Sequence, residues 1–206
     1  MAKIEFLFDI VCPWCYIGKK YFDQIDSDIF KRLEGIEWKS YLLNPNMPQE
    51  GIDRDVYMIK KFNGIDNAKN VYNNVRLAGI KAGINFNFDL IRSMPNSTDA
   101  MALISKLKNN KNISKIINSL FEAFFEKGKN INDKNVLKEY FEDFLDISTI
   151  ENISKSTIKE KIIQEDLDYK KKGIDGVPAI IIDQKKFISG AQETKKLEGY
   201  LKNYLA

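Results

Sequence analysis

The chain has 206 residues, of which 44% are hydrophobic and 12% aromatic, so it has enough apolar surface for a sizeable core, and global disorder is excluded. Its formal charge of +3 is nearly balanced, and its scattered basic residues form no stripe of the kind that binds nucleic acid. The chain contains no histidine, which excludes imidazole catalysis and histidine-containing metal sites.

The beginning of the chain predicts a cytoplasmic location. Met1-Ala2-Lys3 leads directly into an apolar strand pattern, without the charged region, apolar stretch and cleavage site of a signal peptide. No uninterrupted apolar run approaches about 18 residues, so we expect neither a membrane span nor a membrane partner. In the cytoplasm, a cysteine pair is more often catalytic or redox-sensing than a permanent crosslink.

The first part of the chain predicts a βαβ unit. Residues 4–8 form a strand with apolar side chains on both faces, as expected inside a sheet. Residues 13–25 follow as a helix. Residues 36–43 form a second strand, which ends at the structure-breaking cluster Asn44-Pro45-Asn46-Met47-Pro48.

The only two cysteines stand between the first strand and this helix, in the motif Cys12-Pro13-Trp14-Cys15. A strand that ends in such a motif and opens a helix is typical of a dithiol redox site, because the unpaired N–H groups and positive dipole end of a helix favour a thiolate at Cys12. Cys15 lies one turn further on, near enough to close a disulfide. Pro13 falls in the first turn, where a missing N–H costs nothing. We expect Cys12 to be the exposed thiol and Cys15 to point into the protein.

Other interpretations of the two cysteines are weaker. A structural zinc ion needs four ligands, and the chain has no further cysteine and no histidine, so no metal site is predicted. A structural disulfide across so short a loop would constrain the unfolded chain little. Asp9, near the end of the first strand, is a candidate for proton transfer at Cys15, and an exposed turn carboxylate is an equally good interpretation.

Residues 51–154 predict an inserted helical domain with almost no strand signal. Its side chains at positions 120, 121, 124 and 125 form an aromatic stripe, which is typical of a helix-bundle core and not of a cofactor surface. Helical patterns recur near residues 56–62, 66–83, 97–109, 113–128, 133–144 and 154–173.

Strands return near the end of the chain. Residues 179–182 and 187–190 form the two arms of a hairpin, and a last helix runs from about residue 192 to residue 204. Residues 1–50 and 155–206 are therefore expected to form one discontinuous domain, into which residues 51–154 are inserted.

Taken together, these motifs resemble the DsbA-like branch of the thioredoxin superfamily, in particular the cytosolic FrnE-like disulfide oxidoreductases of bacteria. The resemblance spans nearly the whole chain. It rests on Phe8-Asp9-Ile10-Val11-Cys12-Pro13-Trp14-Cys15-Tyr16-Ile17-Gly18, on Asn96-Ser97 with Ala100 and Leu103, on Gly173-Ile174-Asp175-Gly176-Val177-Pro178-Ala179, and on Ser189-Gly190-Ala191-Gln192.

The resemblance implies an α/β thioredoxin fold (βαβ…ββα) with an all-helical domain inserted after the second strand. The residues alone leave open whether Pro178 is cis or begins an edge strand, and the resemblance implies a cis Val177–Pro178 bond beside the dithiol. Val177 is expected to offer backbone groups to an extended substrate. Pro13 and Trp14 are expected to set the acidity of the Cys12 thiol and hence the redox potential of the pair. Trp14, Tyr16 and Pro178 are expected to form an apolar rim, although helix packing explains Tyr16 equally well.

The function implied is that of a protein-disulfide oxidoreductase in which Cys12 is the nucleophile and Cys15 resolves the mixed disulfide. We expect no cofactor beyond the redox-active disulfide itself, with glutathione as a candidate reductant. The expected partners are disulfide or dithiol substrates, either proteins or small molecules, and the chain is expected to be a monomer or a homodimer.

Two alternatives stay open. The first is a glutathione-dependent isomerase, or a transferase like those of the kappa class, with Asn44, Val177 and Ser189 lining a glutathione site. Those relatives carry a hydroxyl in place of the first cysteine and lack the paired thiol, so Cys15 favours redox chemistry. The second is a non-catalytic binding module in which the dithiol is a redox switch.

Overall fold

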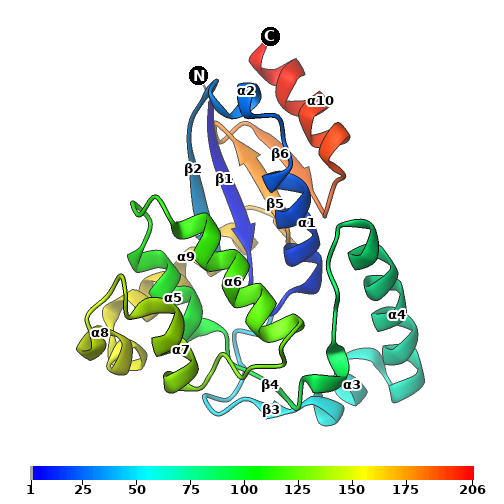
Figure 1. Cartoon of the computed structure of the whole chain (residues 1–206), viewed down its shortest axis with the longest axis vertical. Coiled ribbons are helices and arrows are strands. Elements are labelled where there is room, and N and C mark those ends of the chain that lie inside the picture. Colours follow the sequence, from blue (N-terminus) through cyan, green and yellow to red (C-terminus); the bar gives the residue numbers. More distant parts are fainter. Residues whose placement is uncertain (1) are drawn as a thin grey trace.

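The computed structural model describes residues 2–206 and places a four-stranded sheet in the middle of the molecule (Figure 1). The strands follow the order β2-β1-β5-β6 across the sheet. β1 and β2 are parallel, whereas β5 runs antiparallel to both β1 and β6. The bounds are Ala2–Phe8 for β1, Leu33–Ser40 for β2, Ala179–Ile182 for β5 and Lys186–Ser189 for β6.

β1 is buried on both of its faces, as its apolar pattern predicts. Ile4, Phe6 and Phe8 belong to the larger core, which also contains the inward side chains of α1 (Pro13–Asp23) and α10 (Thr194–Leu205). Leu7 faces the other way, into a smaller core with Tyr169 of α9 (Thr157–Lys171). The sheet is therefore covered on both faces, and the end of β1 that leads into the cysteine motif is held in place from both sides.

The helices predicted from the sequence are present, with ends that differ by a few residues. Short aspartate caps begin several of them: Asp53 accepts hydrogen bonds from two backbone N–H groups at the start of α3, and Asp133 does so from one at the start of α7. The remaining bounds are Ser27–Phe30 for α2, Arg54–Phe62 for α3, Ile65–Lys81 for α4, Thr98–Lys106 for α5, Ile113–Phe125 for α6 and Lys134–Phe141 for α7.

Some short elements were not predicted. β3 (Ile52–Asp53) and β4 (Ser93–Met94) form a two-stranded ribbon, so the inserted segment is not entirely helical. α2, α8 (Ile147–Glu151) and two 3₁₀ turns, Phe88–Leu90 and Ile153–Lys155, are also additional. Elements of two to five residues are too short to show a periodic hydrophobic pattern, and this explains why the sequence did not reveal them.

The aromatic stripe of α6 is core, as predicted. Leu120, Phe121, Phe124 and Phe125 are all buried, and the Phe121 ring lies 6.1 Å from the ring of Phe8 on β1. One hydrophobic core thus runs from the sheet into the helical segment without interruption. The expected domain boundaries, at residues 50 and 155, stay a prediction.

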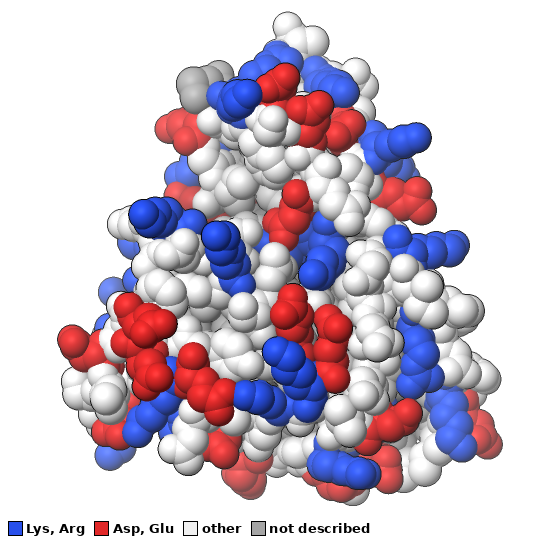
Figure 2. Space-filling model, viewed as in Figure 1, with Lys and Arg blue, Asp and Glu red and all other residues white. Residues whose placement is uncertain are grey.

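Lysine and arginine side chains alternate with aspartate and glutamate over the face shown in Figure 2. Neither sign collects in a continuous stripe on that face. Within residues 2–206, no helix combines the length and the hydropathy that crossing a bilayer requires.

Candidate active site

The dithiol motif lies at the connection between the end of β1 and the start of α1. Cys12 is the N-cap residue of α1, with extended backbone angles (φ −94°, ψ 112°), and its Sγ accepts a hydrogen bond from the Cys15 backbone N–H at 3.3 Å. Pro13 occupies the first turn, where its missing N–H leaves no hydrogen bond unmade. The sulfur of Cys12 therefore takes the place of the oxygen that normally caps a helix, at the end where a negative charge is favoured.

Both cysteines are free thiols, and both are buried, Cys12 with 3% and Cys15 with 0% of its surface exposed. Burial raises the pKa of the Cys15 thiol well above its usual value, and the adjoining Cys12 sulfur raises it further. The expectation that Cys12 is openly exposed is wrong, because residues far along the chain cover its sulfur. The exposed member of the motif is instead Trp14, at 41%.

Val177 is the distant residue that contacts the Cys12 sulfur, and Pro178 follows it in the same loop. The Cys12 thiol donates to the Val177 carbonyl oxygen at 3.6 Å, and the Val177–Pro178 peptide bond is cis. Gly18 of α1 allows this loop to approach closely, because a Cβ atom at position 18 would lie only 2.8 Å from Cγ of Pro178. The structure thus brings the two terminal motifs of the sequence against each other.

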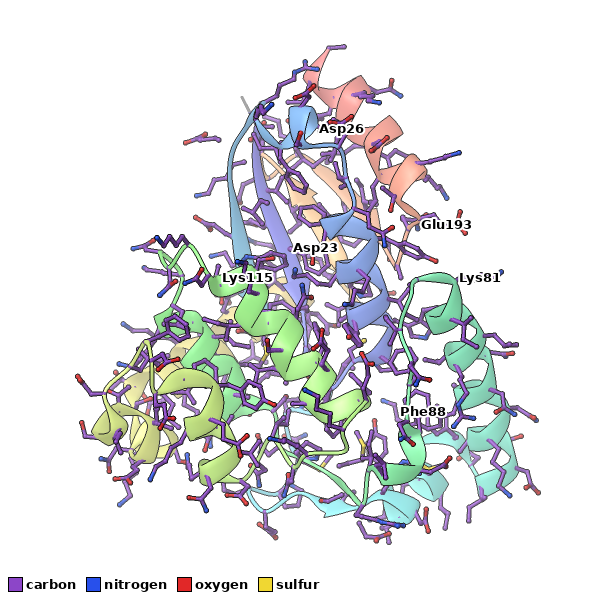
Figure 3. The ribbon with its side chains drawn as sticks, in the orientation of Figure 1. Asp23, Asp26, Lys81, Phe88, Lys115 and Glu193 are labelled. Atoms are coloured by element: carbon purple, nitrogen blue, oxygen red, sulfur yellow. The ribbon has the colours of Figure 1, made fainter. Side chains whose placement is uncertain are left out.

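The other residues expected to bind substrate occupy different environments. Trp14 is exposed beside the motif, Pro13 and Val177 are half-buried, and Pro178 is buried. Trp14 also lines a cavity of about 290 Å³, whose border includes Lys81 at the end of α4 and Glu193 before α10 (Figure 3).

Tyr16 does not lie at the rim of the site. Its ring is buried and stacks on Phe121 of α6 at a centroid distance of 5.0 Å, and its hydroxyl donates to Glu126 at 2.5 Å. The Tyr16 side chain lies on the face of α1 that packs against α6, where its ring stacks on the aromatic residues Phe121 and Phe125. Its role is to hold α1 against the helical segment, which is the packing interpretation that the sequence left open.

Asp9 is fully buried and not the exposed turn residue of one interpretation. Its carboxylate accepts hydrogen bonds from the backbone N–H groups of Val11 at 3.2 Å and Leu43 at 2.8 Å. Burial raises the pKa of Asp9 to about 6, while these N–H groups and Ser97 hold it from rising further. Asp9 also interacts electrostatically with the Cys15 thiol. A buried carboxylate that titrates near neutral pH thus stands beside the buried thiol.

Tyr57 of α3 was not predicted as a site residue, and its ionisation is influenced by Asp9 and Cys12. Tyr57 lines a cavity of about 430 Å³ together with Asn44, and the two side chains are within hydrogen-bonding distance. Electrostatic interaction with Asp9 and Cys12 raises the pKa of Tyr57 in addition to the effect of burial. Nothing in the sequence marked this tyrosine, because one aromatic residue in a helical pattern is indistinguishable from a packing residue.

Metal-ligating side chains do not gather near the dithiol or elsewhere in the described part of the chain: residues 2–206 contain no group of three or more cysteine, aspartate or glutamate side chains placed to hold an ion.

A family model described as a DSBA-like thioredoxin domain matches residues 3–202. No curated protein sequence matches the chain significantly.

Solved structures share the fold at low identity. A probable DsbA oxidoreductase from Streptomyces coelicolor has a TM-score of 0.83 and 19% identity, with 98% of this chain and 89% of that chain covered. A 2-hydroxychromene-2-carboxylate isomerase has a TM-score of 0.70 and 14% identity, covering 98% and 95%. The cytosolic disulfide reductase DsbM from Pseudomonas aeruginosa, solved with GSH, has a TM-score of 0.67 and 13% identity, covering 98% of both chains.

Proposed function

Because the chain belongs to the DSBA-like thioredoxin domain family, we propose that it is a thiol:disulfide oxidoreductase that works through Cys12 and Cys15. The observation that carries the proposal is the position of Cys12. Its sulfur caps the start of α1, 3.3 Å from the Cys15 backbone nitrogen, and faces Val177 beside the cis proline.

In the reducing direction, the Cys12 thiolate attacks one sulfur of a substrate disulfide. The substrate S–S bond breaks, a Cys12–substrate bond forms, and the departing sulfur leaves with the electron pair and takes up a proton. Cys15 then loses its proton and attacks the Cys12 sulfur, which releases the second substrate thiolate and leaves a Cys12–Cys15 disulfide. The oxidising direction is the reverse sequence.

Cys15 is the thiol that is hard to deprotonate, since burial raises its pKa. Asp9 is the group placed to accept its proton: its carboxylate is buried nearby and is ionised above a pH of about 6. The Asp9 carboxylate is hydrogen-bonded to the Val11 and Leu43 N–H groups and not to the Cys15 sulfur, so the proton would pass to it through an intervening water and leave the site when Asp9 next ionises. This assigns Asp9 the role of a base in the second half of the reaction.

Substrate is proposed to bind in extended form against Val177, whose half-buried backbone groups lie next to the reacting sulfur. The carbonyl that the Cys12 thiol contacts becomes available once that thiol has reacted. Pro13, Trp14 and Pro178 supply apolar contacts around it. Disulfide or dithiol substrates, either protein or small molecule, and glutathione as the reductant complete the proposal. The DsbM structure was solved with GSH, and DsbM is described as cytosolic, which supports the same compartment for this chain.

The isomerase alternative shares the fold, as the 2-hydroxychromene-2-carboxylate isomerase structure illustrates. The paired Cys15 beside Cys12 favours redox chemistry over that alternative. The FrnE-like subfamily, the oligomeric state and the redox-switch alternative stay predictions.

The test is insulin reduction by the purified protein with glutathione as electron donor. Activity should disappear in Cys12→Ser. Cys15→Ser should instead accumulate a mixed disulfide between Cys12 and the substrate, visible as an adduct by intact-protein mass spectrometry. Turnover of a hydroxychromene substrate with glutathione that survives Cys15→Ser would replace the proposal with the isomerase. Oxidation-dependent changes of oligomeric state without insulin reduction would replace it with the switch.

A further inference from the structure

A cavity of about 460 Å³ lies at the end of α1 that is away from the dithiol. It is bordered by the end of α1, by α2, by β2 and by the loop that leads from α5 into α6. Figure 3 labels Asp23, which borders the cavity, and Lys115 at the start of α6. Eleven residues, or roughly 16 Å of helix, separate Asp23 from Cys12, so the cavity is distinct from the dithiol site.

One wall of this cavity is aromatic and fixed in place. Phe30 and Trp38 border the cavity with half-buried side chains, so part of each side chain stays uncovered. Both rings pack edge-on against the ring of Phe22, which is buried, at centroid distances of 5.4 and 6.1 Å. The wall therefore offers a preformed apolar surface on which a flat ring can stack.

The mouth of the cavity carries a net positive charge. Lys108 and Lys111 border it from the loop between α5 and α6, and neither lysine takes part in an ion pair within residues 2–206. Asp23 is the only carboxylate among the described bordering residues, and the fully buried Lys19 already balances its charge at 2.6 Å. The charge that this mouth lacks is therefore that of an anionic ligand.

Two carboxamides stand between these lysines in the sequence, and both border the cavity: Asn109 and Asn110. The side-chain oxygen of Asn110 accepts a hydrogen bond from the Asn112 backbone N–H at 2.8 Å, which leaves its NH₂ group as the available donor. Asn109 is exposed and keeps a donor and an acceptor for a ligand. A carboxamide of this kind matches the edge of an adenine ring, which presents a donor beside an acceptor.

We propose that this cavity binds an adenine mononucleotide, with the base against Phe30 and Trp38 and the phosphate at Lys108 and Lys111. Its volume of about 460 Å³ is within the roughly 300–1,000 Å³ of small-molecule sites. The aromatic wall stacks the base, the asparagine carboxamides pair with its edge, and the two ammonium groups balance the phosphate dianion. The site is separate from the dithiol and does not depend on the proposed redox function.

The experiment is isothermal titration calorimetry of the whole chain with AMP, adenosine and inorganic phosphate. AMP should bind at least about tenfold more tightly than either of its parts, because only AMP uses both the aromatic wall and the lysines. Phe30→Leu keeps an apolar side chain and should weaken AMP by about fivefold without changing the affinity for phosphate. Equal affinities for AMP and phosphate would overturn the inference, because the cavity would then bind any small anion.

The lysines have a matched control in Lys115, which is exposed nearby at the start of α6 and does not border the cavity. Lys108→Gln and Lys111→Gln should each weaken AMP by about tenfold, the loss of one hydrogen bond to a charged group. Lys115→Gln should change the affinity by less than about twofold. No detectable binding of AMP, or equal losses in Lys111→Gln and Lys115→Gln, would also overturn the inference.

Discussion

The two ends of α1 differ in how firmly their side chains are held. At the N-terminal end, the thiol of the capping residue Cys12 makes one long contact, 3.6 Å, with the Val177 carbonyl oxygen. Nearer its other end, α1 carries Lys19, which makes two hydrogen bonds of 2.6 Å to Asp23 and one of 2.8 Å to Ser114 on α6. The Lys19 ammonium also lies 4.6 Å from the centre of the Trp38 ring. In Figure 3, Asp23 lies on the side of α1 that faces the beginning of α6, near Lys115.

The comparison shows how one helix combines a reactive end with a fixed one. Lys19 is fully buried, and its hydrogen bond to Ser114 joins α1 to α6, whereas its two bonds to Asp23 lie within α1. At the dithiol end, in contrast, the Cys12 thiol makes only a long contact with Val177, and the reaction replaces this contact with a covalent bond to the substrate or to Cys15. Rigidity at the Lys19 end keeps Cys12 and Val177 in register while their own contact changes.

The largest effect is expected from removing the fixed end. Lys19→Met should lower the free energy of unfolding by roughly 3 kcal/mol, the low end for a broken buried ion pair, because Asp23 still reaches water. Urea denaturation measures this change. The control is Lys20→Met, since Lys20 is partly exposed and 3.7 Å from Glu122, and its loss should cost less than about 1 kcal/mol. Equal losses in the two variants would show that buried Lys19 does not hold α1 against α6.

A smaller effect is expected where α1 touches the proline loop. Gly18→Ala places a Cβ atom 2.8 Å from Pro178 and should cost roughly 1.5 kcal/mol through overpacking, with slower insulin reduction because Val177 moves relative to Cys12.

Gly199→Ala in α10 is the matched change, because a Cβ atom there meets open space. It should leave activity unchanged and stabilise the protein by up to about 1 kcal/mol. A Gly18→Ala variant as active and as stable as Gly199→Ala would contradict the close packing of α1 on the loop.

The smallest effect is expected for the proton acceptor. Asp9→Asn should slow resolution of a preformed Cys12 mixed disulfide by about tenfold above pH 6, less than the roughly 100-fold of a directly hydrogen-bonded base, and should remove the rise in rate through pH 6. Stopped-flow release of a chromophoric thiol measures this step. A variant that keeps the wild-type pH profile would exclude Asp9 as the base.

The same carboxyl predicts a pH dependence of stability. Its pKa in the folded protein, about 6, is above the value of 3.8 for an unperturbed carboxyl. Between these values the folded protein holds a proton that the unfolded chain has released, so this contribution to stability is present at low pH and is lost as pH rises through 6. In Asp9→Asn, denaturation midpoints should lack this decline.

The sequence revealed the parts of the molecule that depend on local pattern. The strand at residues 4–8, the cysteine motif at the start of a helix and the hairpin near residue 180 all follow from hydrophobic period and turn residues. The family resemblance added the pairing of the first and last motifs. The burial of Cys12 under the Val177 loop and the packing of Tyr16 on α6 depend on how distant segments come together, and no local pattern encodes that.

The contact between Cys12 and Val177 joins residues 165 positions apart in the sequence. During synthesis, both thiols therefore leave the ribosome long before the loop that covers them exists. A nascent chain carries an uncovered pair of cysteines until β5, Ala179–Ile182, has been made and has paired with β1. Completion of the C-terminal strands is thus the event that turns an indiscriminate dithiol into a selective one.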